Sequence, residues 1–156
     1  MTEANAGNDR DLVLTRLIDA PRHNVFRAWS EPELLMQWFA PKPWSTPKAE
    51  IDFRPGGANR ITMADPDGNE FPNVGVYLEI VPDEKIVFTD AFGTDWTPQK
   101  PFMTVVLTFA DEDGKTRYTA RARHWTPEDR AAHEKMGFYD GWGQCADQLA
   151  EVARTL

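Results

Sequence analysis

Alternating hydrophobic and polar positions mark most of this chain as β-structure. Residues 11–19 (DLVLTRLID) are predicted to form a strand, and similar segments follow one another from about residue 46 to residue 125. The polar stretches at residues 65–68 (DPDG) and 111–114 (DEDG) are typical of hairpin turns. Consecutive strands joined by short turns predict an antiparallel meander with the segments KAEIDFR, ANRITMA, NVGVYLEIV, KIVFTDAF, FMTVVLTFA and TRYTARARHW.

Two short helices are predicted directly after the first strand. Pro21 suits the first position of a helix, and Val25, Phe26 and Trp29 form an apolar face behind it. Residues 30–33 (SEPE) predict a capping box that begins a second short helix, and the prolines of residues 40–44 (APKPW) end that helix.

A long helix is predicted at the C-terminal end of the chain. Residues 126–129 (TPED) combine a capping threonine, a proline at the first position and acidic residues in the first turn. Apolar residues then recur in steps of three and four along one helical face about five turns long: Phe138, Trp142, Cys145, Leu149, Val152 and Leu156. One strand, two short helices, about six strands and one long helix predict a two-layer α+β domain.

The strand at residues 116–124 shows which side of the sheet faces inward. Because side chains alternate along a strand, its arginines are expected to meet solvent, while Tyr118, Ala120, Ala122 and His124 face the helix. Met103, Val105, Leu107 and Phe109 are the corresponding inward residues of the neighbouring strand. The opposing helix carries Gly137, Gly141 and Gly143, which together disfavour a helix by about 3 kcal/mol relative to alanine. Small residues on both layers indicate either close packing or a cavity, and a Gly141→Leu variant is expected to fold with modest loss of stability.

Composition limits the class of protein. The 156 residues are 41% hydrophobic and 27% charged, as expected for one folded domain, here predicted at residues 11–156 after a flexible tail at residues 1–10. No apolar run approaches the about 20 residues that span a bilayer, and the polar start has no signal core. The net charge of −8 argues against partners that are nucleic acids or anionic membranes, and the single cysteine suits the cytoplasm. The oligomeric state stays open, a homodimer included.

Several short motifs follow one another in a characteristic order. They are residues 19–21 (DAP), 25–29 (VFRAW), 32–35 (PELL) with Trp38 and Pro41, 54–57 (RPGG), 66–68 (PDG), 75–80 (GVYLEI) with Pro82, 86–89 (IVFT), and 141–142 (GW) with Leu149. Together they resemble the START-like, or SRPBCC, superfamily over about residues 11–155. Within it the chain is most similar to the branch named after activator of heat-shock-protein-90 ATPase homologues, whose bacterial members are also described as polyketide-cyclase-like.

This resemblance implies a helix-grip fold, in which a curved antiparallel sheet of about six to seven strands wraps around the long C-terminal helix. It also implies a largely apolar cavity between the two layers that binds a hydrophobic small molecule. Phe39 and Asn59 depart from residues common in the family, and Asn59 is expected to make one wall more polar. The residues predicted to line this cavity are Trp38, Phe39, Asn59, Ile61, Met63, Tyr77, Phe88, Val105, Leu107, Tyr118, Ala120, Ala122, His124, Phe138, Gly141 and Trp142. The segment at residues 38–44 and the loop at residues 93–101 are expected to form its entrance.

Metal and cofactor motifs are missing from the sequence. His133 and Glu134 begin like a zinc-protease helix, but Gly137 stands where the second histidine ligand would be. The glycine pair at residues 56–57 has no following Lys-Ser/Thr of a phosphate loop. Cys145 lies on the apolar helix stripe and is interpreted as a small core residue. We therefore predict no metal and no cofactor.

Four residues are weak candidates for catalysis: Glu79, Asp90, His124 and His133. Glu79 lies in a strand that is apolar on both faces, so it is either a buried carboxylate with a raised pKa or a surface acid, and Asp90 is a similar case. His124 ends an inward strand face, and His133 shares a helical face with Gly137 and Gly141. Each histidine either reaches the cavity or is satisfied elsewhere.

Three functions are compatible with the sequence. Binding of a hydrophobic or aromatic molecule, lipid-like or polyketide-like, is preferred because the resemblance and the inward residues both favour it. A cyclase, dehydratase or hydrolase would need two of the four candidates within hydrogen-bond reach of each other or of one point in the cavity. The third function, regulation of a chaperone ATPase, is suggested by the family's name. Activators of that kind carry a further N-terminal domain, whereas this chain begins about ten residues before the predicted fold.

Overall fold

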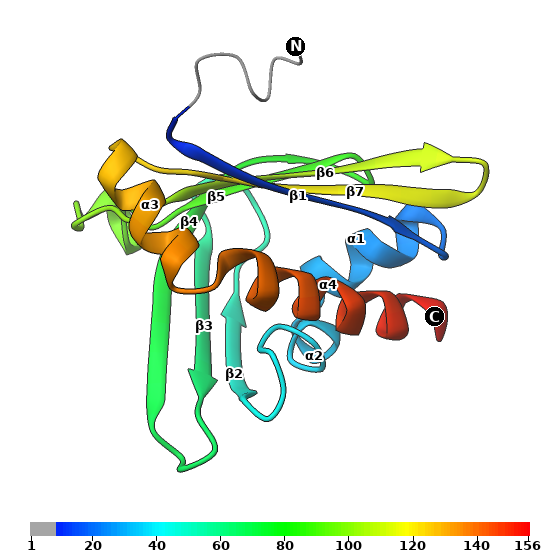
Figure 1. Ribbon diagram of the computed structural model, residues 1–156, viewed down its shortest axis with the longest axis horizontal. Helices are drawn as coiled ribbons and strands as arrows, with labels where there is room; N and C mark the ends of the chain where they lie inside the picture. Colours follow the sequence, from blue (N-terminus) through cyan, green and yellow to red (C-terminus); the bar gives the residue numbers. More distant parts are fainter. Residues whose placement is uncertain (1–8) are drawn as a thin grey trace.

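The alternating segments pair into one sheet in the computed structural model, which describes residues 9–156 (Figure 1). Its seven strands lie in the order β1-β7-β6-β5-β4-β3-β2, and every neighbouring pair is antiparallel. The predicted meander is confirmed for β2 to β7, and β1 joins it beside β7. The strands are β1 (Asp11–Ile18), β2 (Ser45–Ile51), β3 (Ala58–Ala64), β4 (Glu70–Val81), β5 (Lys85–Thr89), β6 (Thr104–Glu112) and β7 (Lys115–Arg123).

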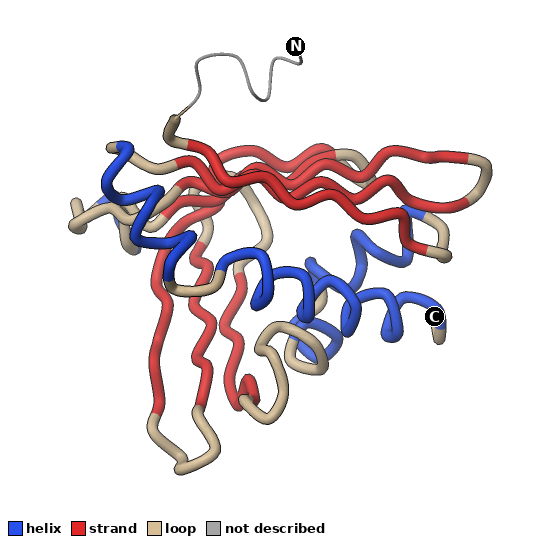
Figure 2. Tube along the Cα trace, in the orientation of Figure 1, coloured by secondary structure: helices blue, strands red, loops and turns tan. Residues whose placement is uncertain are grey.

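The helices occupy one side of this sheet, as the helix-grip α+β fold requires (Figure 2). They are α1 (Arg22–Ser30), α2 (Pro32–Leu35), the short 3-10 helix η2 (Thr94–Trp96), α3 (Pro127–Lys135) and α4 (Phe138–Arg154). The sheet bends so that β2, β3 and β4 turn away from β1, β6 and β7, and α4 runs beneath the bend (Figure 1). Most of the predicted tail at residues 1–10 lies outside the described residues.

The bend has a local cause in β4. The pairing register of β4 with β5 shifts between Tyr77 and Glu79, which is a β-bulge. Gly75, nearby in β4, approaches the next strand so closely that a Cβ atom there would collide with the carbonyl oxygen of Thr89. A residue without a side chain and an irregular register therefore permit the tight curvature that opens space in front of the sheet.

Two details of the predicted helices are wrong. The last helix is interrupted, because Gly137 has a φ of 101° and separates α3 from α4. Residues 30–33 form no capping box, because the N-cap of α2 is Glu31, whose side chain forms no capping hydrogen bond. The Ser30 hydroxyl instead donates a hydrogen bond of 3.4 Å to the carbonyl oxygen of Arg27, earlier in the chain. The start of α3 is confirmed, since the backbone N–H of Asp129 donates to the Thr126 hydroxyl at 3.0 Å.

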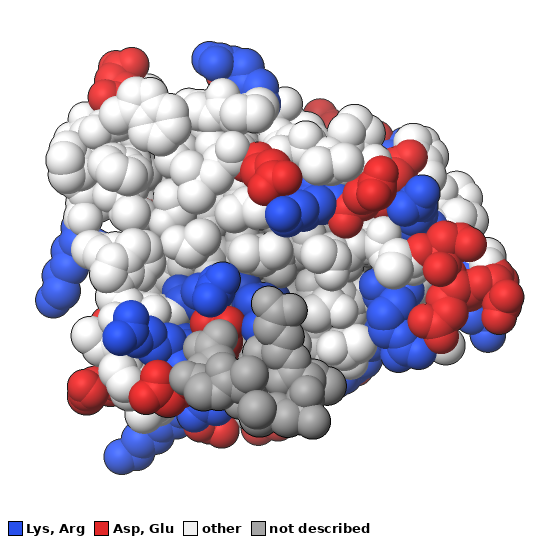
Figure 3. Space-filling model, turned by 90° about the horizontal axis from the view of Figure 1, so that it is seen from above, with Lys and Arg blue, Asp and Glu red and all other residues white. Residues whose placement is uncertain are grey.

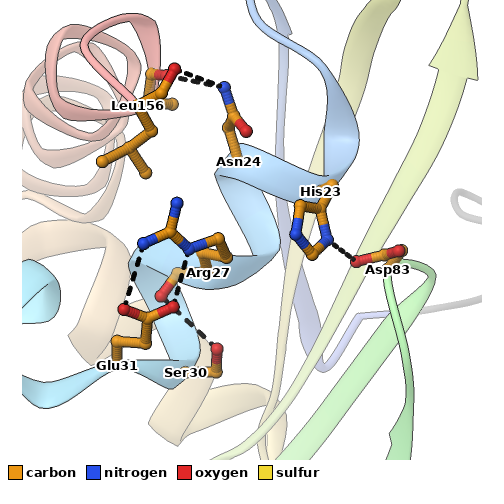
Figure 4. A network of polar contacts seen from close by, with 8 residues as sticks. His23, Asn24, Arg27, Ser30, Glu31, Asp83 and Leu156 are labelled. Atoms are coloured by element: carbon orange, nitrogen blue, oxygen red, sulfur yellow. Dashed lines mark hydrogen bonds and ion pairs between the residues drawn. The ribbon is translucent and has the colours of Figure 1, made fainter.

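Polar contacts hold α1 against its surroundings (Figure 4). Nδ2 of Asn24 donates at 3.2 Å to the carbonyl oxygen of Ala153 in α4 and at 3.4 Å to a backbone carboxylate oxygen of Leu156 just after it. His23 Nδ1 lies 2.9 Å from Oδ1 of Asp83 in the β4–β5 turn. These contacts join α1 to the end of the C-terminal helix and to the β4–β5 turn of the sheet.

The two faces of the sheet differ as the alternation predicts. Val105, Leu107, Ala120 and Ala122 are fully buried under the helices. The opposite face carries charges of both signs, interspersed over the surface seen in Figure 3, including an ion pair of 2.8 Å between Arg117 and Glu112. The sheet therefore has one solvated face and one face committed to the interior.

Candidate functional site

A cavity of about 720 Å³ lies between the bent sheet and α4. Its wall is assembled from distant parts of the chain: α1, residues 38–41, strands β3 to β5 and β7, the loop before β6, and the junction of α3 with α4. Among the residues expected from the sequence, this wall contains Trp38, Phe39, Asn59, Ile61, Met63, Phe88, Tyr118, Phe138, Gly141 and Trp142.

The other expected residues lie elsewhere. Tyr77, Val105, Leu107, Ala120 and Ala122 belong to the hydrophobic core and are at most 2% exposed. Val105, Leu107, Ala120 and Ala122 lie on β6 and β7, which α1 contacts, so the two layers pack closely there. Tyr77, on β4, packs against Phe53 and Phe88. His124 is also absent from the cavity wall, because it lies behind His133 at the end of β7.

The glycines of the last helix therefore have different roles. A Cβ atom added at Gly141 would meet nothing within 4 Å, and Gly141 lines the cavity. Gly143 lies off the cavity wall, and a Cβ atom there would meet Nη2 of Arg16 at 2.7 Å. Both interpretations of the small residues are therefore correct, at different positions: Gly141 borders the cavity, whereas Ala120 lies where the two layers pack closely.

Aromatic side chains make the wall apolar because their polar atoms are already used. Trp38 Nε1 donates to the Ala28 carbonyl oxygen at 2.9 Å, and Trp29 Nε1 donates to the Tyr118 hydroxyl at 3.2 Å. The two indole rings pack edge to face, 4.7 Å between centroids. With their N–H groups satisfied, these residues offer only ring carbon to a bound molecule.

A few polar groups interrupt this apolar wall. Asn59 is 6% exposed, and no described residue forms a hydrogen bond with its side-chain amide. The Tyr118 hydroxyl accepts from Trp29, and burial raises its pKa, so it stays protonated at neutral pH. Cys145 donates its thiol to the Phe39 carbonyl oxygen at 3.2 Å, and burial raises its pKa to about 12. Its thiol is thus unreactive at neutral pH.

Two of the four catalytic candidates meet at one end of the cavity. Nε2 of His124 lies 2.8 Å from Nδ1 of His133, and Nδ1 of His124 lies 2.7 Å from the Arg10 carbonyl oxygen. His133 lines the cavity and is 8% exposed. Burial, and secondly the neighbouring His124, lower the pKa of His133 to about 4. The break at Gly137 allows α3 to carry His133 over the end of β7, which places the two rings together.

The acidic candidates are not part of this pair. Glu79 is exposed and forms an ion pair of 3.1 Å with Lys85. Asp90 lines the cavity, but its Oδ1 accepts from the backbone N–H groups of Phe102 and Met103, at 2.8 and 3.2 Å. Asp90 therefore anchors the loop before β6.

The loop supplies wall residues that sequence reasoning missed. Gln99, Lys100, Phe102 and Met103 line the cavity beside Trp29. The sequence placed the loop at residues 93–101 at the entrance, and Gln99 and Lys100 of that loop line the cavity. Trp44, from the other expected entrance segment, lies tilted against Phe71 with 5.4 Å between ring centroids, and Trp96 in the loop is 54% exposed.

No metal centre is formed within residues 9–156, where no three His, Cys, Asp or Glu side chains gather as ligands. None of the helices in the same range combines the length and apolar character needed to cross a bilayer.

Comparisons place the chain among known proteins. Residues 19–154 match the family described as activator of Hsp90 ATPase homolog 1-like protein. A crystal structure from Nitrosomonas europaea is 43% identical, with a TM-score of 0.91 over 94% of this chain and 96% of that one. A Chromobacterium violaceum structure is 26% identical, with a TM-score of 0.75 over 91% and 96%. A Mycobacterium smegmatis structure, 23% identical with a TM-score of 0.78 over 92% and 90%, shows the same fold. No curated protein matches the chain.

Proposed function

Because the chain belongs to the family of activator of Hsp90 ATPase homolog 1-like proteins, we propose that it binds a hydrophobic or aromatic small molecule in its internal cavity. The fold of this family commonly binds hydrophobic ligands. The finer assignment, a lipid-like or polyketide-like molecule, is our proposal for this chain.

The observation that carries the proposal is the cavity itself. Its volume of about 720 Å³ lies within the about 300–1,000 Å³ usual for small-molecule sites. Its wall combines Trp29, Trp38 and Trp142 with a few polar groups such as Asn59 and His133. This mixture supports a mainly apolar ligand that is oriented by a small number of hydrogen bonds.

The experiment is ligand discovery on the full chain. Native mass spectrometry of protein purified from cells should reveal a retained apolar molecule, and a library of aromatic and lipid-like compounds should contain members that raise Tm. Trp29, Trp38 and Trp142 in the wall should report binding through their fluorescence. If no compound is retained, raises Tm or changes this fluorescence, the proposal is wrong.

An enzyme of cyclase, dehydratase or hydrolase type in the same cavity is the second candidate, favoured by the His124–His133 pair at 2.8 Å. His133 offers a lone pair beside the cavity that can take a proton from a bound molecule, but its pKa of about 4 makes it a weak base at neutral pH. If the protein converts a ligand found in the library, loss of that turnover in His133→Asn, with ligand binding retained, would support this candidate. Unchanged turnover in that variant would exclude His133 as the base.

The cytoplasmic location stays a prediction, supported by the single cysteine and its unreactive thiol. Size-exclusion chromatography with light scattering would decide whether the protein is a monomer or the homodimer that the sequence leaves open.

A further inference from the structure

The protonation of the histidine pair is fixed by a backbone carbonyl group. The Arg10 carbonyl oxygen accepts from the backbone N–H of His124 at 2.9 Å and lies 2.7 Å from its ring Nδ1. A carbonyl oxygen has no proton to donate. Nδ1 of His124 must therefore carry a ring proton, and when the ring holds only that proton, the lone pair is on Nε2.

The position of the proton on His124 also fixes the position of the proton on His133. Nε2 of His124 is the acceptor, so Nδ1 of His133, 2.8 Å away, must be the donor. A neutral imidazole has only one N–H, and the remaining nitrogen of His133, Nε2, therefore carries a lone pair. The lowered pKa of His133, about 4, keeps the ring neutral at pH 7.

The lone pair on His133 Nε2 has no partner in the protein. His133 is 8% exposed and lines the cavity, and among residues 9–156 no group donates to its Nε2. Within this range Thr46 Oγ1 is the one fully enclosed side-chain polar atom without a partner, so Nε2 of His133 is open to the cavity. A hydrogen-bond donor on a bound molecule would satisfy this lone pair in place of cavity water.

The structure around this nitrogen limits the shape of the donor. The His133 ring lies among aromatic rings, with centroid distances of 4.9 Å to Phe102, 5.2 Å to Phe138 and 6.3 Å to Trp142. These side chains suit a flat aromatic group better than a branched alcohol. Asn59 on β3, also unpartnered and 6% exposed, offers a second polar contact from another part of the wall.

We propose that the cavity selects a phenol-like ligand, an apolar aromatic molecule whose hydroxyl group donates a hydrogen bond to Nε2 of His133. His124 acts as a positioning residue that holds His133 in the required tautomer. This inference rests on the proposed binding function and names the chemical class of its ligand. An ether or carboxylate oxygen at the same place would bring two acceptors together and would be disfavoured.

The first test needs no ligand. The chain has three histidines, so nitrogen-detected NMR of the full protein at neutral pH should resolve three imidazole rings. His133 should show a protonated Nδ1 and an unprotonated Nε2, with the signals assigned by His23→Asn and His133→Phe. A protonated Nε2 in the wild-type protein would overturn the inference without any statement about binding.

The second test compares naphthol with its methyl ether, two ligands of similar shape that differ in the hydroxyl hydrogen. Wild type should bind naphthol roughly 10-fold more tightly, measured by tryptophan fluorescence and calorimetry. His133→Phe should remove this preference while retaining affinity for the ether. His124→Leu, which alters a residue outside the cavity wall, should also remove it because His133 can then adopt either tautomer.

Two controls separate tautomer control from a general structural effect. His124→Gln, whose amide oxygen can accept from His133 Nδ1, should restore the preference for naphthol. His23→Leu, which removes an exposed histidine bonded to Asp83, should leave it unchanged. Equal affinity of wild type for naphthol and the ether would overturn the inference while leaving the binding function intact. Binding of neither, with the expected tautomer, would overturn the ligand class, whereas the binding function itself is decided by the screen of the full library.

Discussion

Replacing Gly141 by leucine should block the cavity and at the same time stabilise the fold. Gly141 lies within α4, and a Cβ atom there would meet nothing within 4 Å. Removing a glycine from a helix interior gains about 0.5–1 kcal/mol. For a chain of this size that gain raises Tm by about 1–4 °C. The sequence alone predicts a modest loss, and the empty space in front of Gly141 reverses the expected sign.

The same leucine should weaken ligand binding. Its side chain projects into the cavity of about 720 Å³ beside Phe138 and Trp142. Forcing extra carbon atoms into an occupied site costs about 1–3 kcal/mol, which corresponds to a Kd raised about 5- to 150-fold. The assay combines thermal unfolding followed by circular dichroism with calorimetric titration of a ligand found in the library.

A matched variant separates helix propensity from cavity filling. Gly143→Ala lies two residues away in α4, outside the cavity wall, and meets only the mobile tip of Arg16. It should keep ligand affinity unchanged. Wild-type affinity in Gly141→Leu would show that the cavity does not hold the ligand. Lower Tm in that variant would show that the space at Gly141 is not free.

Three further outcomes follow from the structure. The free energy of unfolding, measured at different pH values, should fall between pH 6.5 and pH 4 by at most about 3 kcal/mol. The reason is that His133 has a pKa of about 4 in the folded protein and 6.5 in the unfolded chain, so the unfolded chain binds more protons in this range. An equally steep fall in His133→Phe would refute this cause. Gln148→Leu should lose about 2–4 kcal/mol in urea unfolding, since its side chain donates to Trp38 and Ala40 at 2.9 and 2.8 Å, whereas the exposed Gln144→Leu should lose less than about 1 kcal/mol. Gly137→Ala should lose about 1–2 kcal/mol because of the positive φ of 101°, and an unchanged midpoint would contradict that reasoning.

Local patterns were sufficient for the strands and most helix starts. The alternation in residues 116–124 identified the inward face of β7, because successive side chains point to opposite sides of any strand. The threonine cap at residue 126 was identified for a similar reason, since its hydroxyl bonds only three residues away. The capping box at residues 30–33 failed because Ser30 still belongs to the end of α1 and its hydroxyl bonds backward.

By itself, the sequence determined the order of the elements, the antiparallel meander and the set of inward residues. Periodicity and turn residues act over a few positions and can be recognised without distant partners. Only the tertiary structure decided which inward residues face empty space. Ala120 lies under packed helices and Met63 faces a cavity, although both are inward positions of strands. The bend of the sheet and the positions of α1 and α4 set the distance between the two layers, and this distance decides whether an inward residue is packed or faces the cavity. The break at Gly137, in turn, brings His133 onto His124, nine residues earlier, and depends on a positive φ that the spacing of apolar residues does not reveal.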